Sequence, residues 1–324
     1  MRVLVTGAAG YVGYAVGRRL VQAGHDVAGL VRRPMQAGEL PDEVVPVVAD
    51  LLDPGNLRAA LRTVVRRELA GPVEGVCHLA ALVRVRDSFA EPLSFFATNV
   101  HGTVNLLSAL PESARVVLGS TAAVYGTPDV QPISEAQRPA PTSPYGFSKL
   151  AAEEALRYCV RSRAAGSVVL RTFNVAGSVD GRPDLDETRL VPRALRVAAG
   201  RLPHLTINGD GTAIREYLHV DDLAGAYLLA LEADMDDEHR VYNVGSGTGT
   251  SVRDVVTTVA EVTGRPVPTV IDPPEPEPPL LMADSSAIRD ELGWSPARSD
   301  LRQIVADSWT ALVNAPESPA SSRS

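Results

Sequence analysis

The sequence has little of what secreted, membrane-spanning or metal-binding proteins usually need. Cys77 and Cys159 are its two cysteines, which are too few for a disulfide framework and have no metal-ligand spacing. No apolar run approaches the roughly 18 residues of a membrane span, and the amino terminus has no signal-peptide core. The six histidines include no pair at i, i+4 spacing. We therefore expect a cytoplasmic protein with no metal site and no membrane contact.

Clustered positive charge is missing as well. The net charge is −8 and no local group of basic residues offsets it, which disfavours a nucleic-acid partner. The remaining composition is ordinary, since 45% of the 324 residues are hydrophobic and 22% are charged. Such a chain can bury a core and need not be disordered. We expect a folded protein with room for about two domain units.

Short β-branched segments alternate with longer segments of helical period in the first half of the chain. This alternation is typical of βαβ units and a parallel sheet. We therefore predict an α/β fold with a Rossmann-type, doubly wound parallel sheet. Strands are expected at residues 2–6, 26–31, 44–48, 75–79, 115–119 and 167–171, and helices at residues 11–23, 54–67, 92–110 and 145–165.

After residue 171 the pattern loosens into Gly- and Pro-rich loops, which predicts a second, smaller lobe. We expect a dinucleotide-binding domain at residues 1–172, with residues 219–244 packed on it, and a C-terminal substrate-binding lobe at residues 173–315. Prolines make residues 272–279 a rigid loop, and small polar residues make 316–324 a disordered tail. Further helices are expected at residues 190–199, 220–233, 252–263 and 300–313.

A glycine-rich loop follows the first expected strand and leads directly into a helix. Its sequence, Gly7-Ala8-Ala9-Gly10-Tyr11-Val12-Gly13, places small residues where backbone must approach a pyrophosphate at a helix N-terminus. The order of strand, glycines and helix predicts dinucleotide binding. The loop residues expected to contact the cofactor are Gly7, Gly10, Tyr11 and Val12.

The ends of the second and third strands bear on which dinucleotide binds. Where such folds usually have an acidic residue, this chain has Arg32 and Arg33. Two guanidiniums suit a ribose 2′-phosphate, so NADP is mildly favoured over NAD, unless both arginines belong to a solvated loop. Asp50, at the end of the third strand, is placed to accept from the adenine amino group or to cap the next helix.

Tyr145 and Lys149 begin an expected helix, and their spacing places the phenol and the ammonium one turn apart on one face. A phenol is protonated at neutral pH and becomes a base only where cations stabilise its anion; Lys149 and an oxidised nicotinamide would supply two. Thr121 follows the fifth strand, at the edge where α/β sheets bind ligands. We predict that the three residues move a substrate proton. The alternatives are an ordinary helix face and a hydroxyl that satisfies backbone.

These motifs together resemble the extended short-chain dehydrogenase/reductase family, in particular its nucleotide-sugar 4-epimerase branch of the UDP-galactose/UDP-glucose type. The resemblance implies inversion of C4 of a nucleotide-diphosphate sugar, by oxidation to the 4-keto sugar and return of hydride to the opposite face. It also implies a homodimer formed through the helices at residues 92–110 and 145–165. It covers residues 1–313 and includes segments 78–81, 99–103, 171–177, 211–224 and 242–247.

The resemblance also implies a role for each matching residue. Tyr145 would accept the proton of the sugar 4-hydroxyl, Lys149 would hold the nicotinamide ribose and lower the phenol pKa, and Thr121 would orient the hydroxyl. Further cofactor contacts would come from Leu51, Leu79, Ala80, Ala81 and Asn99. The substrate would contact Asn174, Arg189, Leu190, Asn208 and Arg215, with Asn174 and Arg215 on the diphosphate.

Other activities of the same scaffold stay open at this point. An NADPH-dependent ketosugar reductase or dehydrogenase would use the same Tyr145 and Lys149. A dehydratase needs an acid and a base directly after Thr121, where this chain has Ala122 and Ala123. A non-catalytic dinucleotide sensor would keep the catalytic residues without using them.

Two departures from the epimerase pattern leave the nucleotide and the sugar open. Val83, followed by Arg84, stands where the family commonly has a lysine. Residues 274–277, Pro-Glu-Pro-Glu, stand where it usually has an Arg-x-Gly-Asp motif. Carboxylates there would repel a diphosphate unless Arg189 supplies the missing positive charge.

Overall fold

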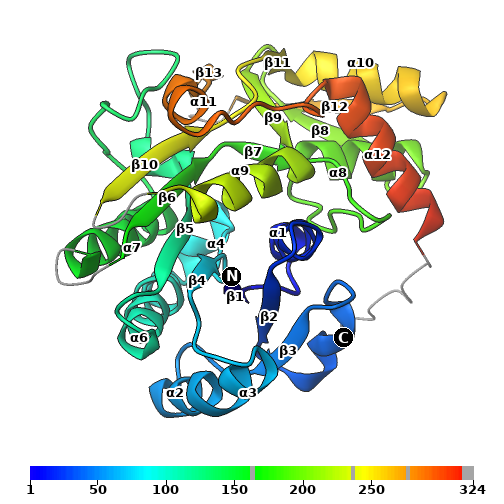
Figure 1. Ribbon diagram of the computed structural model, residues 1–324. Helices are drawn as coiled ribbons and strands as arrows, with labels where there is room; N and C mark the ends of the chain where they lie inside the picture. The colour runs from blue at the N-terminus through cyan, green and yellow to red at the C-terminus, as the bar shows by residue number, and fades with distance from the viewer. Residues whose placement is uncertain (161–164, 235–237, 275–277, 316–324) are drawn as a thin grey trace.

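The computed structural model describes residues 1–160, 165–234, 238–274 and 278–315. Its main sheet contains seven parallel strands in the order β10-β6-β5-β4-β1-β2-β3 (Figure 1). The order reverses direction between β4 and β1, as it does in a doubly wound fold, so the predicted Rossmann-type class is confirmed. The strands are β1 (Arg2–Thr6), β2 (Asp26–Val31), β3 (Val45–Val48), β4 (Gly75–His78), β5 (Arg115–Thr121), β6 (Ser167–Thr172) and β10 (His239–Val244).

Helices cover both faces of this sheet. The central strand shows why: Val3 and Val5 point to one face and Leu4 to the other, and all three are fully buried. Each face is therefore apolar and must pack against helices. The first face is covered by α1 (Tyr11–Gln22) and α9 (Val220–Glu232), and the second by α2 (Pro54–Ala60), α6 (Gly102–Ala109) and α7 (Pro144–Val160).

Two helices that the sequence predicts as continuous are interrupted. A π-helical turn at Leu61–Val65 separates α2 from α3 (Arg66–Glu68), and another at Ala97–His101 separates α5 (Pro92–Phe96) from α6. Such turns often mark functional positions in a helix, and the second one contains Asn99. The structure adds a short helix that was not predicted, α4 (Val85–Ala90).

Local capping fixes where several helices begin and end. The carboxylate of Asp53 accepts from the backbone amides of the first turn of α2. The alternative that Asp50 caps this helix is therefore wrong, because Asp50 lies one turn too early and accepts from the amide of Leu52 instead. At α10 (Val252–Thr263), Ser251 forms a capping box and Gly264 ends the helix with a φ of 66°.

In the described residues, the C-terminal part is built from short strands and four helices. β7 (Asn174–Ala176), β9 (Ile214–His219), β11 (Gly249–Ser251) and β13 (Leu280–Leu281) form one sheet, and β8 (Leu205–Asn208) pairs with β12 (Thr269–Asp272). Helices α8 (Leu190–Ala198), α10 and α12 (Leu301–Asn314) share a core that includes Leu195, Val259 and Ile304. A fourth helix, α11 (Ser286–Leu292), packs against β10.

Three predicted segments lie partly or entirely outside the described residues, the first being the helix at residues 145–165, of which residues 161–164 lie outside. In the proline-rich segment, Asp272 is the last residue of β12 and not part of the predicted loop, because it pairs with Asn208 of β8. Residues 273–274 and 278–279 form no helix or strand, and residues 275–277 lie outside. The predicted disordered tail, residues 316–324, lies outside entirely.

In the described part of the chain, no helix is both long enough and apolar enough to span a membrane.

Candidate active site

The carboxyl ends of three neighbouring strands carry the residues of the candidate site. The glycine loop follows β1, residues 79–81 follow β4, and Thr121 is the last residue of β5. Parallel strands present their carboxyl ends at one edge of the sheet, and ligands bind where the strand order reverses. The structure therefore brings these three segments together beside the point of reversal.

The glycine loop is shaped for close approach of backbone to a ligand. Gly7 has a φ of 68°, and a Cβ atom there would lie 2.8 Å from the amide nitrogen of Ala80. At Gly13 a Cβ atom would lie 2.0 Å from the carbonyl oxygen of Gly7. Gly10 is the N-cap residue of α1 and contributes no capping side chain, so the amides of the first turn are presented by backbone alone. Such a helix N-terminus is suited to an anion such as pyrophosphate.

A buried histidine connects the ends of β1 and β4. The hydroxyl of Thr103 donates to the carbonyl of Asn99 at 2.6 Å, so it accepts from Nε2 of His78 at 2.9 Å. Nδ1 of His78 then accepts from the hydroxyl of Thr6 at 2.7 Å. Burial and the charge of Lys149 lower the pKa of His78 to about 3, so the ring is neutral. His78 thus has a fixed tautomer and orients the loop after β4.

Asn99 lies in the π-helical turn and links this loop to the catalytic helix. Its amide exchanges two hydrogen bonds with the backbone of Leu82, at 2.8 and 3.0 Å. The same amide donates to the hydroxyl of Ser148 at 2.9 Å, and Ser148 donates to the carbonyl of Tyr145. The predicted cofactor residue Asn99 is therefore fully buried and positions α7.

The three predicted catalytic residues come together at the end of β5 and the start of α7. Tyr145 and Lys149 are both buried, and Phe95 packs its edge against the Tyr145 ring at a centroid distance of 6.2 Å. Burial raises the pKa of Tyr145, while a hydrogen bond with Thr121 and the charge of Arg189 lower it. The expected net lowering of the Tyr145 pKa is not found in the protein alone, because burial outweighs the charged groups around the phenol.

Lys149 has a pKa lowered to about 8 by burial, with the charge of Glu153 acting in the opposite direction. Glu153 follows Lys149 by one helical turn and is itself 3% exposed. Its carboxylate accepts from Arg171 at 2.7 Å and from the hydroxyl of Ser120. The ion pair of Glu153 and Arg171, which lies behind Lys149, was not predicted from the sequence. The i, i+4 spacing of Lys149 and Glu153 was its only local signal.

The remaining predicted cofactor residues lie along the same edge of the sheet. Arg32 and Arg33 are exposed at the end of β2, and no ion pair involves either of them among the described residues. Asp50 is half-buried, whereas Leu51 is packed into the core beneath α2 and α6. The amides of Leu79 and Ala80, which precede Ala81, donate to the hydroxyl of Thr6. Tyr11 donates to the carbonyl of Gly177, and Val12 is half-buried in the first turn of α1.

The predicted substrate residues are divided between two regions. Arg189 pairs with Asp184 at 3.0 Å and approaches the Tyr11 ring, and Leu190 begins α8. Asn174, on β7, donates to the carbonyl of Glu216. Of these three residues, Arg189 lies near the start of α7, since its charge affects Tyr145.

Arg215 and Asn208 lie on the sheets of the C-terminal part. Arg215 is paired with Thr250 in the β9–β11 register and donates to the carbonyl of Ile214. Asn208 is exposed at the end of β8, opposite Asp272, and no hydrogen bond joins it to the catalytic residues in the described structure.

Arg84, at the position of the first departure from the epimerase pattern, pairs with Asp186 at 3.4 Å. Val83 beside it is exposed. Within the part of the chain that the structure describes, no three His, Cys, Asp or Glu side chains gather in a geometry suited to a metal ion.

The fold and the site together define a dinucleotide-binding enzyme of the extended short-chain dehydrogenase/reductase type. The chain matches the family described as NAD dependent epimerase/dehydratase over residues 3–245, and it belongs to this family. It is 40% identical over 322 residues to UDP-glucose 4-epimerase of Streptomyces lividans, and the alignment covers 95% of both chains. The resemblance that the sequence motifs indicate is therefore confirmed.

Solved structures agree with this assignment. UDP-glucose 4-epimerase from Stenotrophomonas maltophila, with bound NAD and formylated UDP-arabinopyranose, matches with a TM-score of 0.87 and 32% identity, over 96% of this chain and 97% of that one. UDP-glucose 4-epimerase from Brucella ovis, in complex with NAD, matches with a TM-score of 0.86 and 33% identity, over 95% of this chain and 97% of that one.

Proposed function

We propose that the protein is an NAD-dependent epimerase that inverts C4 of a nucleotide-diphosphate sugar. The observation that carries the proposal is the group formed by the buried Tyr145 and Lys149 with the half-buried Thr121, at the sheet edge that also carries the glycine loop, with alanines at positions 122 and 123. This group can move a proton and offers no neighbouring acid for elimination. The relatives, which are UDP-glucose 4-epimerases at up to 40% identity over nearly the whole chain, support the same activity.

The proton in this reaction moves between the sugar and the phenol. Tyr145 accepts the proton of the 4-hydroxyl, which Thr121 orients by its own hydroxyl. Tyr145 must be in its phenolate form to accept this proton, its own proton having first passed to solvent, and the ammonium of Lys149, one turn away, would stabilise that phenolate. Tyr145 returns the proton when the 4-keto sugar has turned and is reduced on its other face.

The residues of the glycine loop fit a dinucleotide. Gly7, Gly10 and the first-turn amides of α1 would hold its pyrophosphate, since side chains at these positions would fill the space. Residues 79–81 would line the nicotinamide side, with Asn99 buried behind them and holding Leu82 in place, and Asp50 would face the adenine. A bound nicotinamide supplies the hydride acceptor and donor of the reaction. Lys149 would also hold its ribose.

NAD is the cofactor that we propose, because both solved relatives described above hold NAD. Neither of these two structures supports the mild preference for NADP that Arg32 and Arg33 suggest. Both guanidiniums are nevertheless exposed and unpaired in the described structure, so a 2′-phosphate would meet no competing carboxylate there.

We propose a UDP-sugar as the substrate, held by residues of the C-terminal lobe, 173–315. Arg189 and Arg215 would supply the cationic contacts to the diphosphate, with Asn174 and Asn208 as neutral donors and Leu190 against the base. Arg189 currently pairs with Asp184, so a diphosphate would have to exchange places with that carboxylate.

We also propose a cytoplasmic homodimer. Apolar side chains on the packed helices α4, α5 and α7 are exposed, and Leu93 is exposed to 82%. Burying such a patch against a second copy would remove it from water. A buried, reduced Cys77 fits a reducing compartment. The other members of the patch are Phe89, Phe147 and Tyr158.

The test is an isomerisation assay with purified protein, a UDP-hexose and NAD. We expect the C4 epimer to accumulate while the NADH concentration, measured by absorbance, shows no net change. Tyr145→Phe should turn over at least about 100-fold more slowly. Stoichiometric loss of NADPH with ketosugar reduction would establish the reductase instead, and loss of water from the sugar would establish a dehydratase. Parallel reactions with NADP in place of NAD decide the cofactor.

A further inference from the structure

A tight hairpin after β7 reaches from the C-terminal part to the glycine loop. Val179 and Arg182 close the turn, with a backbone hydrogen bond of 2.9 Å. Its central residues, Asp180 and Gly181, have φ values of 51° and 69°. Two positive φ angles are the signature of a type I′ turn, for which Asp-Gly is a preferred sequence. The position of Arg182 is therefore set by a rigid local structure.

Arg182 joins two segments that would bind adjacent parts of a dinucleotide in this fold, the pyrophosphate and the adenosine. One guanidinium nitrogen donates to the carbonyl of Ala9, inside the glycine loop, at 2.5 Å. The other donates to the carbonyl of Glu39 at 2.5 Å, at the end of the segment that follows β2. The guanidinium also lies over the Tyr14 ring, 4.7 Å from its centroid. A single side chain thus fixes the pyrophosphate loop relative to the adenosine side of the crevice.

Further contacts hold the hairpin on α1. The carboxylate of Asp180 pairs with Arg18 at 2.6 Å, and the carbonyl of Gly177 accepts from Tyr11 at 2.7 Å. Both partners belong to the helix that begins at the glycine loop. The hairpin therefore contacts this helix at its first residue and again two turns later.

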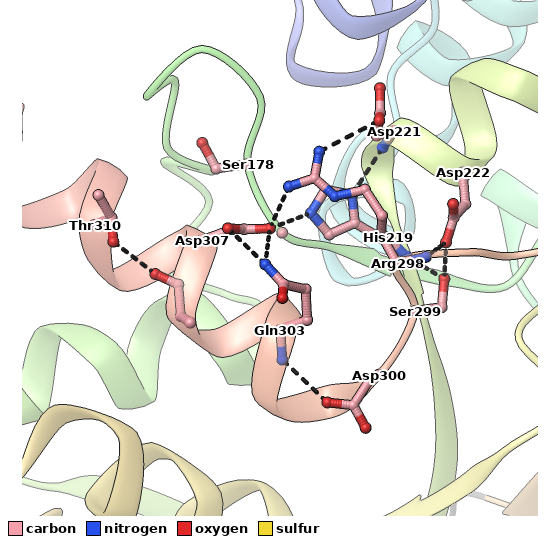
Figure 2. A network of polar contacts seen from close by, with 12 residues as sticks. Ser178, His219, Asp221, Asp222, Arg298, Ser299, Asp300, Gln303, Asp307 and Thr310 are labelled. Atoms are coloured by element: carbon pink, nitrogen blue, oxygen red, sulfur yellow. Dashed lines mark hydrogen bonds and ion pairs between the residues drawn. The ribbon is translucent and has the colours of Figure 1, made fainter.

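The base of the hairpin rests on a polar network that Figure 2 shows from close by. Gly177 packs so tightly on His219 that a Cβ atom would lie 2.4 Å from the imidazole ring. Nδ1 of His219 accepts from the amide of Asp221, so Nε2 donates to Asp307 at 3.1 Å. Asp307 also accepts from Arg298 at 2.8 Å. The His219 ring is therefore held by hydrogen bonds at both of its nitrogens. Because Asp307 lies on α12, a movement of the hairpin toward His219 would also disturb α12.

We propose that Arg182 is a positioning residue that retains the dinucleotide during turnover, by tying the carbonyls of Ala9 and Glu39 to the hairpin of the C-terminal lobe. The inference rests on the proposed function, because an epimerase must keep its reduced cofactor while the 4-keto sugar turns. A tie with two charge-assisted hydrogen bonds resists the separation of the two segments that release requires.

The experiment measures how fast NADH leaves the protein. Protein loaded with NADH is mixed with a large excess of NAD, and the decay of bound-NADH fluorescence gives the dissociation rate. We expect Arg182→Met, which keeps the apolar stem on Tyr14 but removes the donors, to raise this rate at least about tenfold. Arg182→Lys, which reaches one carbonyl at a time, should give an intermediate rate. Arg302→Ala removes an exposed arginine paired with Glu261 and is the matched control.

A general loss of structure would lower the melting temperature without this graded order, so thermal melts are recorded beside the kinetics. A release rate in Arg182→Met within twofold of wild type overturns the proposal. This experiment contains no sugar and measures cofactor release alone. A protein that failed to epimerise a sugar would contradict the proposed function but not the proposal for Arg182.

Discussion

At the scale of single residues, the buried ammonium of Lys149 lowers the free energy of unfolding. It is 4% exposed, and it is the only lysine in a chain that otherwise uses arginine for positive charge. Arginine does not release its proton in proteins, whereas lysine shifts its pKa readily when buried. The proposed site of proton transfer therefore carries the chain's one lysine, whose pKa burial can shift.

This cost predicts that Lys149→Met is more stable than the wild type at neutral pH. The pKa is lowered from 10.5 to about 8, so below pH 8 the folded protein holds a charge that burial disfavours. A shift of this size corresponds to about 3 kcal/mol in the free energy of unfolding. Between pH 8 and 10.5 the unfolded chain binds more protons than the folded one, so the wild type recovers this stability as pH rises. Urea unfolding at pH 7 and pH 10 measures both effects.

The variant is expected to lose turnover while it gains stability, as is common at active sites. A single lysine also allows a direct check, because protein labelled with isotope only in lysine gives one side-chain resonance. If that resonance titrates near 10.5, the ammonium is not buried as described and the predicted gain is absent.

At the scale of elements, β9 is the strand on which the C-terminal part depends. Glu216, in its middle, is fully buried, and its carboxylate accepts from the amides of Gly247, at 2.8 Å, and Ala283. These contacts join β9 to the segment after β10 and to the segment after β13. Successive residues of a strand face opposite sides, so the same contacts fix the orientation of Arg215.

We predict that Glu216→Gln lowers the free energy of unfolding by about 1–3 kcal/mol, because one backbone donor loses its acceptor and faces an amide NH₂ instead. Chemical denaturation measures the change. Glu154→Gln, on the exposed side of α7 and paired with Arg157, is the control and should stay within about 0.5 kcal/mol of wild type. Equal stability of the two variants would show that the buried carboxylate does not hold β9.

The elements that could be predicted from the sequence are those with strong local signals. β1 and β2 were placed to the residue, since each is a continuous apolar run bounded by glycine or charge. β10 could not be found in this way, because it becomes a strand only by pairing with β6. Thr121, Tyr145 and Lys149, the proposed catalytic residues, lie on local motifs, but the contact of Arg182 with Ala9 spans 173 residues and depends on the folded chain.

At the scale of the whole molecule, the exposed apolar patch of Phe89, Leu93, Phe147 and Tyr158 predicts how copies associate. We expect Leu93→Glu to convert the proposed dimer into monomers, because a charge would enter the proposed apolar contact. Sedimentation velocity measures the state. Ile271→Glu, at a residue of β12 that is exposed to 62%, is the control and should remain dimeric. A wild-type protein that sediments as a monomer would contradict the proposed dimer.

The main sheet is completed late in the chain. The polypeptide leaves it after β6, builds β7 to β9, and returns to add α9 and β10 before leaving again (Figure 1). A nascent or truncated chain that stops at residue 172 would have β6 as an open edge, and open edges recruit other chains. During synthesis, about three quarters of the polypeptide must therefore leave the ribosome before the main sheet is complete. A fragment that ends at residue 172 is expected to be unsuitable for studying the nucleotide-binding half on its own.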